Sequence, residues 1–241
     1  MLSPRDGKSR REIVAALRGQ LGEWEAQARR GGSDLLSLGS PLLDGLLPEG
    51  GIRPGGLVEW LAAVEGGGAT TLAVMMAREA CRAAGALVVI DVGGEFYPPA
   101  AAAVGLDLDR TILVQPRNEA DAVWAFDQAL RCGGVAAALA WPRRLSTRAF
   151  RRLQLAAAGA GGLGLLVRPE SCRDSPSWAD ARLLVRPLPG RAGRRLRVET
   201  LRCRGGEGGT IEVEIDDETG ALRLVPPLAA AAPGRRQAGT S

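Results

Sequence analysis

The sequence predicts an α/β fold whose mainly parallel central sheet is extended by a C-terminal antiparallel β-meander. Up to residue 167, short runs that are apolar on both faces alternate with helical stretches, as in a parallel sheet covered by helices. After residue 180 the runs mix polar and apolar residues at period two and are joined by Gly- and Pro-rich turns. With 241 residues, 46% of them hydrophobic, the chain has enough apolar mass for one sizeable core.

The first predicted element is an amphipathic helix over residues 9–30. Its apolar residues recur at helical spacing and are Ile13, Leu17, Leu21 and Trp24. The glycines that follow end this helix and separate it from the core. The sequence leaves open which of three surfaces the apolar stripe covers: its own domain, a second copy of the chain or another protein.

The chain therefore divides into three parts. Residues 1–32 form the N-terminal helix, residues 33–227 the core, and residues 228–241 a tail of Ala, Pro, Gly and Arg that we expect to be disordered. In the core, strands are predicted at residues 57–61, 87–91, 135–141 and 163–167, and helices at residues 70–84, 118–132 and 147–158. The meander comprises residues 183–186, 196–202, 210–215 and 222–225.

Composition excludes many function classes. The chain has no histidine, and Lys8 is its only lysine, so the other 30 of the 31 basic residues are arginines. A histidine-based triad, an imidazole metal site and a catalytic lysine within the core are therefore excluded. The net charge of +4 and the pI of about 9.3 permit contact with nucleic acid or an acidic partner without requiring it.

The cysteines and the apolar runs predict a cytoplasmic protein. Four cysteines without a CxxC pair favour neither a zinc site nor a disulfide scaffold, so we expect four buried free thiols in a reducing compartment and no bound metal. No apolar run approaches the roughly 18 residues of a membrane span, and the first residues are too polar for a signal peptide. We expect no membrane contact.

The most informative segment is the glycine-rich turn that follows the strand at residues 57–61. A strand, such a turn and a helix form the frame of a phosphate-binding loop with the pattern G-x-x-x-x-G-K-[ST]. Gly68 matches the second glycine and Thr70 the metal-binding hydroxyl, but Ala63 replaces the first glycine and Ala69 the lysine. The degenerate loop comprises Ala63, Glu65, Gly66, Gly67, Gly68, Ala69, Thr70 and Thr71.

Around this loop the chain resembles the RecA recombinase core. The stretch LLSLGSPLLDGLLPEGGIRPGGLVEWLAAVEGGGATTLA at residues 35–73 is similar to the opening of that core, and ALVVIDVGGEFYPPAAAAVGLDLDRTILVQP at residues 86–116 continues the likeness. The resemblance covers about residues 33–167 and implies a RecA-like P-loop NTPase core with a short helix after the second strand. The later β-meander is compatible with the same core.

Departures from the RecA pattern determine the expected function. Gly93 stands where the resemblance places a catalytic glutamate, with Glu95 two residues away, and Trp141 stands where it places a magnesium-binding aspartate. Loss of one component of such a site costs several kcal/mol of barrier, on the order of 10³-fold in rate. We therefore expect no ATPase activity and no cofactor. The site that would hold a triphosphate, which we call the cradle, is expected to offer no cationic side chain and no acid to position magnesium. Weak nucleotide binding by the remaining backbone amides is left open.

This pattern of loss resembles the ImuA family of RecA-related proteins. The Arg168-Pro169 step and the segment LRCRGG at residues 201–206 are also similar to that family. The resemblance implies a non-catalytic adaptor in bacterial damage tolerance, in the SOS response, that supports translesion synthesis. Its implied partners are an ImuB-like polymerase homologue, an error-prone polymerase and RecA.

Two arginine clusters are candidates for contact with DNA or a partner. Five arginines after the strand at residues 135–141 lie at the sheet edge where α/β proteins bind ligands: Arg143, Arg144, Arg148, Arg151 and Arg152. A second cluster, on a hairpin tip, comprises Arg191, Arg194, Arg195 and Arg197. For each cluster the alternative is a solvated surface with no ligand, and any single-stranded DNA contact is expected to be weak because aromatic residues for stacking are scarce.

Tryptophans offer further candidates. Core packing is the expected role of Trp124 and Trp141, and Trp141 is placed to fill the vacated nucleotide pocket. Trp178 is the best candidate for an exposed anchor. Two other function classes stay open: an active DNA-dependent ATPase or recombinase of the RecA class, and a SulA-like inhibitor of cell division. Self-association through the N-terminal helix also stays open.

Overall fold

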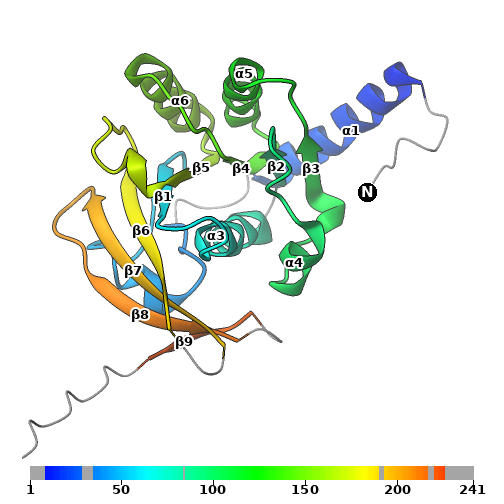
Figure 1. Ribbon diagram of the computed structural model, residues 1–241. Helices are drawn as coiled ribbons and strands as arrows, with labels where there is room; N and C mark the ends of the chain where they lie inside the picture. The colour runs from blue at the N-terminus through cyan, green and yellow to red at the C-terminus, as the bar shows by residue number, and fades with distance from the viewer. Residues whose placement is uncertain (1–8, 29–34, 84, 190–192, 217–219, 226–241) are drawn as a thin grey trace, which may run out of the picture.

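The computed structural model describes residues 9–28, 35–83, 85–189, 193–216 and 220–225. In this part of the chain the strands form one nine-stranded sheet, in the order β3-β2-β4-β5-β1-β6-β7-β8-β9 (Figure 1). The predicted tail at residues 228–241 and the end of the predicted N-terminal helix lie outside the described residues.

One half of the sheet is parallel, as predicted. It contains β1 (Leu57–Ala62), β2 (Ala86–Ile90), β3 (Thr111–Val114), β4 (Val135–Ala140) and β5 (Leu163–Pro169). Its central strands are buried on both faces, which explains their continuous apolar sequences. The short strand β3 was not predicted; it lies at the edge of the sheet, where three of its residues are half-buried and Leu113 is exposed.

The other half is the antiparallel meander. It contains β6 (Ala181–Leu188), β7 (Arg194–Cys203), β8 (Thr210–Ile215) and β9 (Leu222–Leu224). β6 pairs in parallel with β1 and joins the two halves into one sheet. In Figure 1 these strands curve around α3, and Leu196, Val198 and Val213 are buried in the same core cluster as that helix.

Helices cover both faces of the parallel half. α3 (Ala69–Ala83) lies on one face, and α5 (Glu119–Leu130) and α6 (Thr147–Ala160) lie on the other (Figure 1). The Asn118 side chain caps α5 by accepting the Asp121 amide at 2.9 Å, as its sequence position predicts. Gly161, with φ of +83°, ends α6 in the left-handed conformation that glycine favours.

Shorter helices complete the chain. α4 (Pro98–Ala103) is the short helix that the RecA resemblance implied, whereas α2 (Pro41–Asp44) was not predicted. Two 3₁₀ turns, η1 and η2, lie at Leu108–Arg110 and Glu170–Cys172.

The N-terminal helix α1 (Arg10–Ala28) contacts its own domain near its C-terminal end. The Leu21 backbone packs so closely on Gly134 that a Cβ there would lie 2.5 Å from the Leu21 carbonyl oxygen. Ile13 and Leu17, nearer the N-terminal end of the helix, are half-buried, and Val14 is exposed. None of the described helices combines the length and apolar character that a bilayer span requires.

The expectation of four buried thiols is wrong for two of them. Cys81 and Cys172 are buried, but Cys132 and Cys203 are only half-buried. Cys132 follows the last turn of α5 and Cys203 ends β7, and side chains at element ends are less completely covered. Burial raises the pKa of the Cys81 thiol to about 12, because the charged thiolate is poorly solvated there.

Candidate functional site

The glycine loop lies between β1 and α3, in the frame of a phosphate-binding loop. Gly66 and Gly68 have φ of +70° and +94°, which L side chains rarely adopt. The Gly67 amide donates a hydrogen bond to the Val64 carbonyl at 3.1 Å. A Cβ on Gly68 would lie 2.7 Å from the Leu196 side chain, so β7 packs directly against the loop.

Trp141 stands beside the loop, directly after β4. Its indole Nε1 donates a hydrogen bond to Thr70 Oγ1 at 3.2 Å, and both residues line one cavity with a volume of about 370 Å³. Thr70 is the residue that aligns with a metal-binding hydroxyl in phosphate loops. In this chain the hydroxyl therefore accepts an indole N–H, and an aromatic ring occupies space next to the loop.

Charged side chains line the same cavity. Ala69, at the lysine position, is buried, and the charged residues on the cavity wall are Glu65, Glu95, Glu170, Arg143 and Arg168. The expectation of a site without any cationic side chain is therefore wrong, because Arg143, in the loop after β4, and Arg168, in β5, both line the cavity. Arg168 pairs with Glu59 and Glu170 with Arg186, whereas Glu65 and Glu95 form no ion pair with a described residue. The unpaired charges on the wall are therefore two carboxylates and the guanidinium of Arg143.

The loop after β2 carries Gly93 and Glu95. Asp91 shapes it: one carboxylate oxygen accepts the amides of Gly94 and Glu95 at 2.8 and 2.9 Å, and the other accepts that of Phe96 at 3.0 Å. Gly93 is exposed, and Glu95 is half-buried at the cavity wall. The structure thus brings Gly93 and Trp141 to one edge of the sheet, near the glycine loop, although 48 residues separate them in sequence.

The five-arginine cluster divides into two groups. Arg143, Arg144 and Arg148 are exposed. Arg151 lies over the Trp178 ring, with its guanidinium carbon 4.7 Å from the ring centroid, and Arg152 lies 3.4 Å from an oxygen of Asp127. Arg148, Arg151 and Arg152 lie on the exposed face of α6, whereas Phe150 and Leu153 are buried. Arg151 and Arg152 already interact with other residues of the chain.

The hairpin cluster is also dispersed. The Arg194 guanidinium approaches Thr71 Oγ1 at 3.4 Å, which connects the meander to the start of α3. Arg195 is half-buried, and Arg197 pairs with Glu212 at 2.6 Å. Arg191 lies outside the described residues.

Two tryptophans differ from each other in exposure. Core packing was the expected role of Trp124, and this is wrong: 63% of Trp124 is exposed. Trp124 precedes the buried Phe126 by two residues, which at 100° per residue rotates it far from the buried face of α5. Trp178 is 42% exposed, with Arg151 stacked on it.

A buried charge network was missed in the sequence analysis. The Glu59 carboxylate, in the middle of β1, accepts hydrogen bonds from Arg168 at 2.7 Å, Arg182 at 2.6 Å and Ser177 at 2.8 Å. All three charged residues are less than 9% exposed. A glutamate inside an otherwise apolar strand was the available signal, because a buried carboxylate requires buried cationic partners.

Potential metal ligands are sparse. Within the described ranges, no three Cys, Asp or Glu side chains gather closely enough to hold a metal ion. Three glutamates, Glu65, Glu95 and Glu170, line the cavity beside Thr70, and Glu170 is paired with Arg186.

The sheet order, the glycine loop and the helix after it define a RecA-like domain. In agreement, the family model described as the RecA N-terminal domain matches residues 21–140. Over 100 residues the chain is 36% identical to protein RecA of Rubrobacter xylanophilus. This match covers 42% of this chain and 29% of that protein. RecA of Streptomyces venezuelae is 33% identical over 102 residues, covering 42% of this chain and 27% of that protein.

A longer match identifies the family within this class. The chain is 33% identical over 197 residues to protein ImuA of Caulobacter vibrioides, covering 73% of this chain and 81% of that protein. It belongs to the ImuA family of RecA-like proteins, as the sequence resemblance predicted.

Proposed function

We propose that this chain is a non-catalytic RecA-like accessory protein of bacterial DNA damage tolerance. It acts in the cytoplasm as an adaptor for translesion synthesis, and its partners are an ImuB-like polymerase homologue, an error-prone polymerase and RecA. Membership of the ImuA family supports the role in damage tolerance. The residues beside the glycine loop support the absence of catalysis.

One observation carries the non-catalytic assignment: the hydrogen bond from Trp141 to Thr70. A phosphoryl-transfer site needs this hydroxyl for magnesium and a lysine for the phosphates. Here an indole engages the hydroxyl, and Ala69 holds the lysine position. Both components on which charge neutralisation depends are therefore replaced.

Electrostatics around the loop supports the same proposal. A triphosphate is a polyanion, and Glu65 and Glu95 would face it inside the cavity. Of the two arginines that line the cavity, Arg168 is paired with the buried Glu59, and Arg143 comes from an exposed position after β4. Arg194 reaches Thr71 at the start of α3, but it comes from β7 and does not replace the lysine of the loop. The balance of charges disfavours nucleotide binding.

The experiment uses a strain that lacks this chain and carries complementing variants. Thr70→Ala is expected to restore damage-induced mutagenesis to the level of the wild-type chain, because no nucleotide chemistry depends on the hydroxyl. Loss of mutagenesis with Thr70→Ala, together with DNA-stimulated phosphate release by the wild-type protein, would assign an active ATPase instead.

Affinity capture tests the partner class in the same strain. We expect the tagged chain to retain an ImuB-like protein after DNA damage. Retention of the tubulin-like division protein in its place would favour the SulA-like alternative.

A further inference from the structure

A second cavity adjoins the one beside the phosphate loop, and the two share four lining residues: Glu65, Glu95, Trp141 and Arg143. Its volume is about 280 Å³, and its walls are formed chiefly by Ile90, Val123, Phe126, Trp141, Leu145 and Leu153. We call it the apolar groove. Ile90, Phe126 and Leu153 are each 1% exposed, and Val92 at its edge is 43% exposed.

The topology places the apolar groove at a ligand-binding position. It lies outside the carboxyl ends of β2 and β4, which are neighbours in the sheet. β2 leads to α4, which packs with α3, whereas β4 leads to α6 on the opposite face. Open α/β sheets bind ligands outside the carboxyl ends of two neighbouring strands whose following connections go to opposite faces of the sheet.

Its size favours a single large side chain as the occupant. Pockets for drug-sized ligands and cofactors typically measure about 300–1,000 Å³, so this cavity lies just below that range. Protein interfaces commonly place one aromatic or branched side chain in such a desolvated pocket.

The charges at the edge of the groove define what flanks that side chain. Glu65, Glu95 and Glu119 line the cavity, against Arg143 alone. Within the described part of the chain, none of these three carboxylates forms an ion pair, and two of them are exposed. An excess of carboxylate attracts basic side chains and repels the phosphates of nucleotides and DNA.

We propose that the apolar groove docks a segment of a partner protein that carries one aromatic or branched anchor flanked by basic residues. The anchor enters between Phe126 and Trp141, and the flanking arginines or lysines face Glu95 and Glu119. The inference rests on the proposed function, because the partner uses the edge of the sheet that a nucleotide would otherwise share.

The test begins with the full-length protein and a random library of 12-residue peptides. Selected peptides are expected to share one Phe, Trp, Leu or Ile with Arg or Lys within a few positions. Selection of acidic or uncharged peptides, or failure to enrich any sequence, would overturn the proposal.

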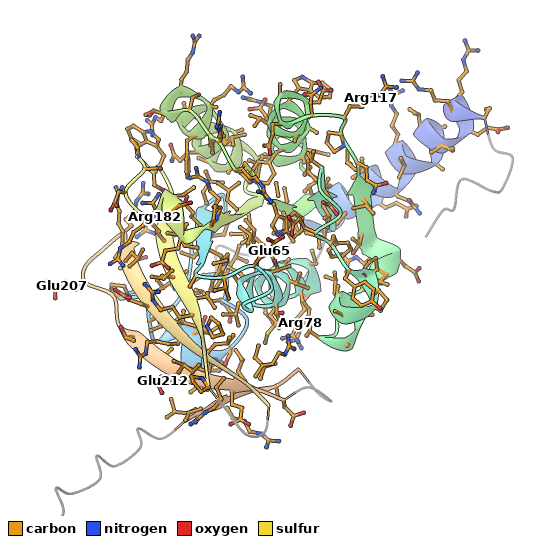
Figure 2. All side chains as sticks on the ribbon, in the orientation of Figure 1. Glu65, Arg78, Arg117, Arg182, Glu207 and Glu212 are labelled. Atoms are coloured by element: carbon orange, nitrogen blue, oxygen red, sulfur yellow. The ribbon has the colours of Figure 1, made fainter. Side chains whose placement is uncertain are left out.

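Variants then locate the binding site, using one selected peptide with a fluorescent label and anisotropy as the readout. Glu119→Lys, at an exposed position, and Glu95→Lys are each expected to weaken binding about tenfold, which is 1.4 kcal/mol. Val123→Trp fills the cavity and is expected to abolish binding. Glu207→Lys has the same charge change at a distant exposed site and leaves affinity unchanged; Figure 2 shows Glu207 at the periphery and Glu65 near the centre.

Circular dichroism and urea unfolding check that each variant is folded. Unchanged affinity in folded Glu119→Lys and Val123→Trp would contradict the assignment of the groove. Displacement of the labelled peptide by a synthetic peptide of residues 226–241 would assign the groove to this chain's own tail, and displacement by oligo(dT) would assign it to DNA.

A nucleotide titration of the same sample separates the two proposals. Micromolar ATP binding would overturn the proposed function together with this inference. Absence of both ATP binding and peptide enrichment would overturn the docking inference alone.

Discussion

Two polar regions lie beside β1, and they differ in how completely their charges are paired. In the buried network, the Glu59 carboxylate accepts three hydrogen bonds and is enclosed by Arg168 and Arg182. Beside the phosphate loop, Glu65 and Glu95 face a cavity without an ion pair to any described residue. The first region fastens β5 and β6 to β1, so it is part of the frame, whereas the second lies where a nucleotide would need cations.

The buried network around Glu59 therefore maintains the fold, whereas the residues beside the phosphate loop determine whether a nucleotide can bind. The chain keeps the frame that positions a phosphate loop, with its charges satisfied, while the residues that would neutralise a triphosphate are replaced. A buried carboxylate without partners is costly, so each change in the frame is expected to affect folding. Changes in the cradle are expected to affect stability less and nucleotide affinity not at all.

Glu59→Gln gives the largest expected effect. The substitution removes the charge that balances Arg168 and Arg182, both less than 9% exposed, and is expected to lower the free energy of unfolding by about 3–5 kcal/mol. Urea unfolding followed by circular dichroism measures it. The matched control is Glu212→Gln, whose pair with Arg197 is at the surface and contributes less than about 1 kcal/mol. Equal effects of the two substitutions would contradict the contrast between frame and surface.

Trp141→Ala tests the same contrast at the cavity beside the phosphate loop. Removal of a half-buried indole and of its hydrogen bond to Thr70 is expected to reduce the free energy of unfolding by about 2 kcal/mol. Trp124→Ala removes the same side chain from an exposed position and is expected to change stability by less than about 0.5 kcal/mol. The same urea unfolding measurement applies to both. A larger loss in Trp124→Ala would mean that Trp141 does not pack against the loop.

Cys81 offers a smaller effect, in the helix that leads from the phosphate loop into the core. Burial raises the pKa of this thiol from 9.0 to about 12, so the folded chain keeps a proton that the unfolded chain loses. The resulting stability is complete below pH 9 and declines between pH 9 and pH 12, by at most about 1.4 kcal/mol per pH unit.

The comparison of wild-type chain and Cys81→Ala in urea unfolding at pH 8, 9 and 10 isolates this effect. The wild-type chain is expected to lose stability more steeply with pH than the variant. Parallel pH profiles would show that the thiol titrates alike in both states.

Much of the fold was predictable because it depends on local patterns. Continuous apolar runs identified the central strands, and Asn118 with its following carboxylate identified the start of α5. The meander was predicted from period-two alternation and glycine turns. Edge strand β3 was missed because its four residues, three half-buried and one exposed, lack a distinct pattern. Helix α2 was missed because it is only four residues long.

The site was predictable only where alignment to a motif fixed the positions. Ala69, Gly93 and Trp141 could be named from the sequence because the RecA pattern assigns each a place. Side-chain partners required the three-dimensional structure. Trp124 was assigned to the core because it lies next to apolar residues of α5 in sequence, although its position two residues before Phe126 places it on the opposite side of the helix. The position of Arg143 at the cavity depends on the path of the loop after β4.

Calorimetric titration of Mg²⁺-ATP into the full-length wild-type protein tests the central claim most directly. Because an indole engages Thr70 and no lysine is present at position 69, the expected result is no saturable binding, with a Kd weaker than about 1 mM. A one-to-one isotherm with a micromolar Kd would contradict the account, since it would show that the phosphate loop still holds nucleotide beside Trp141.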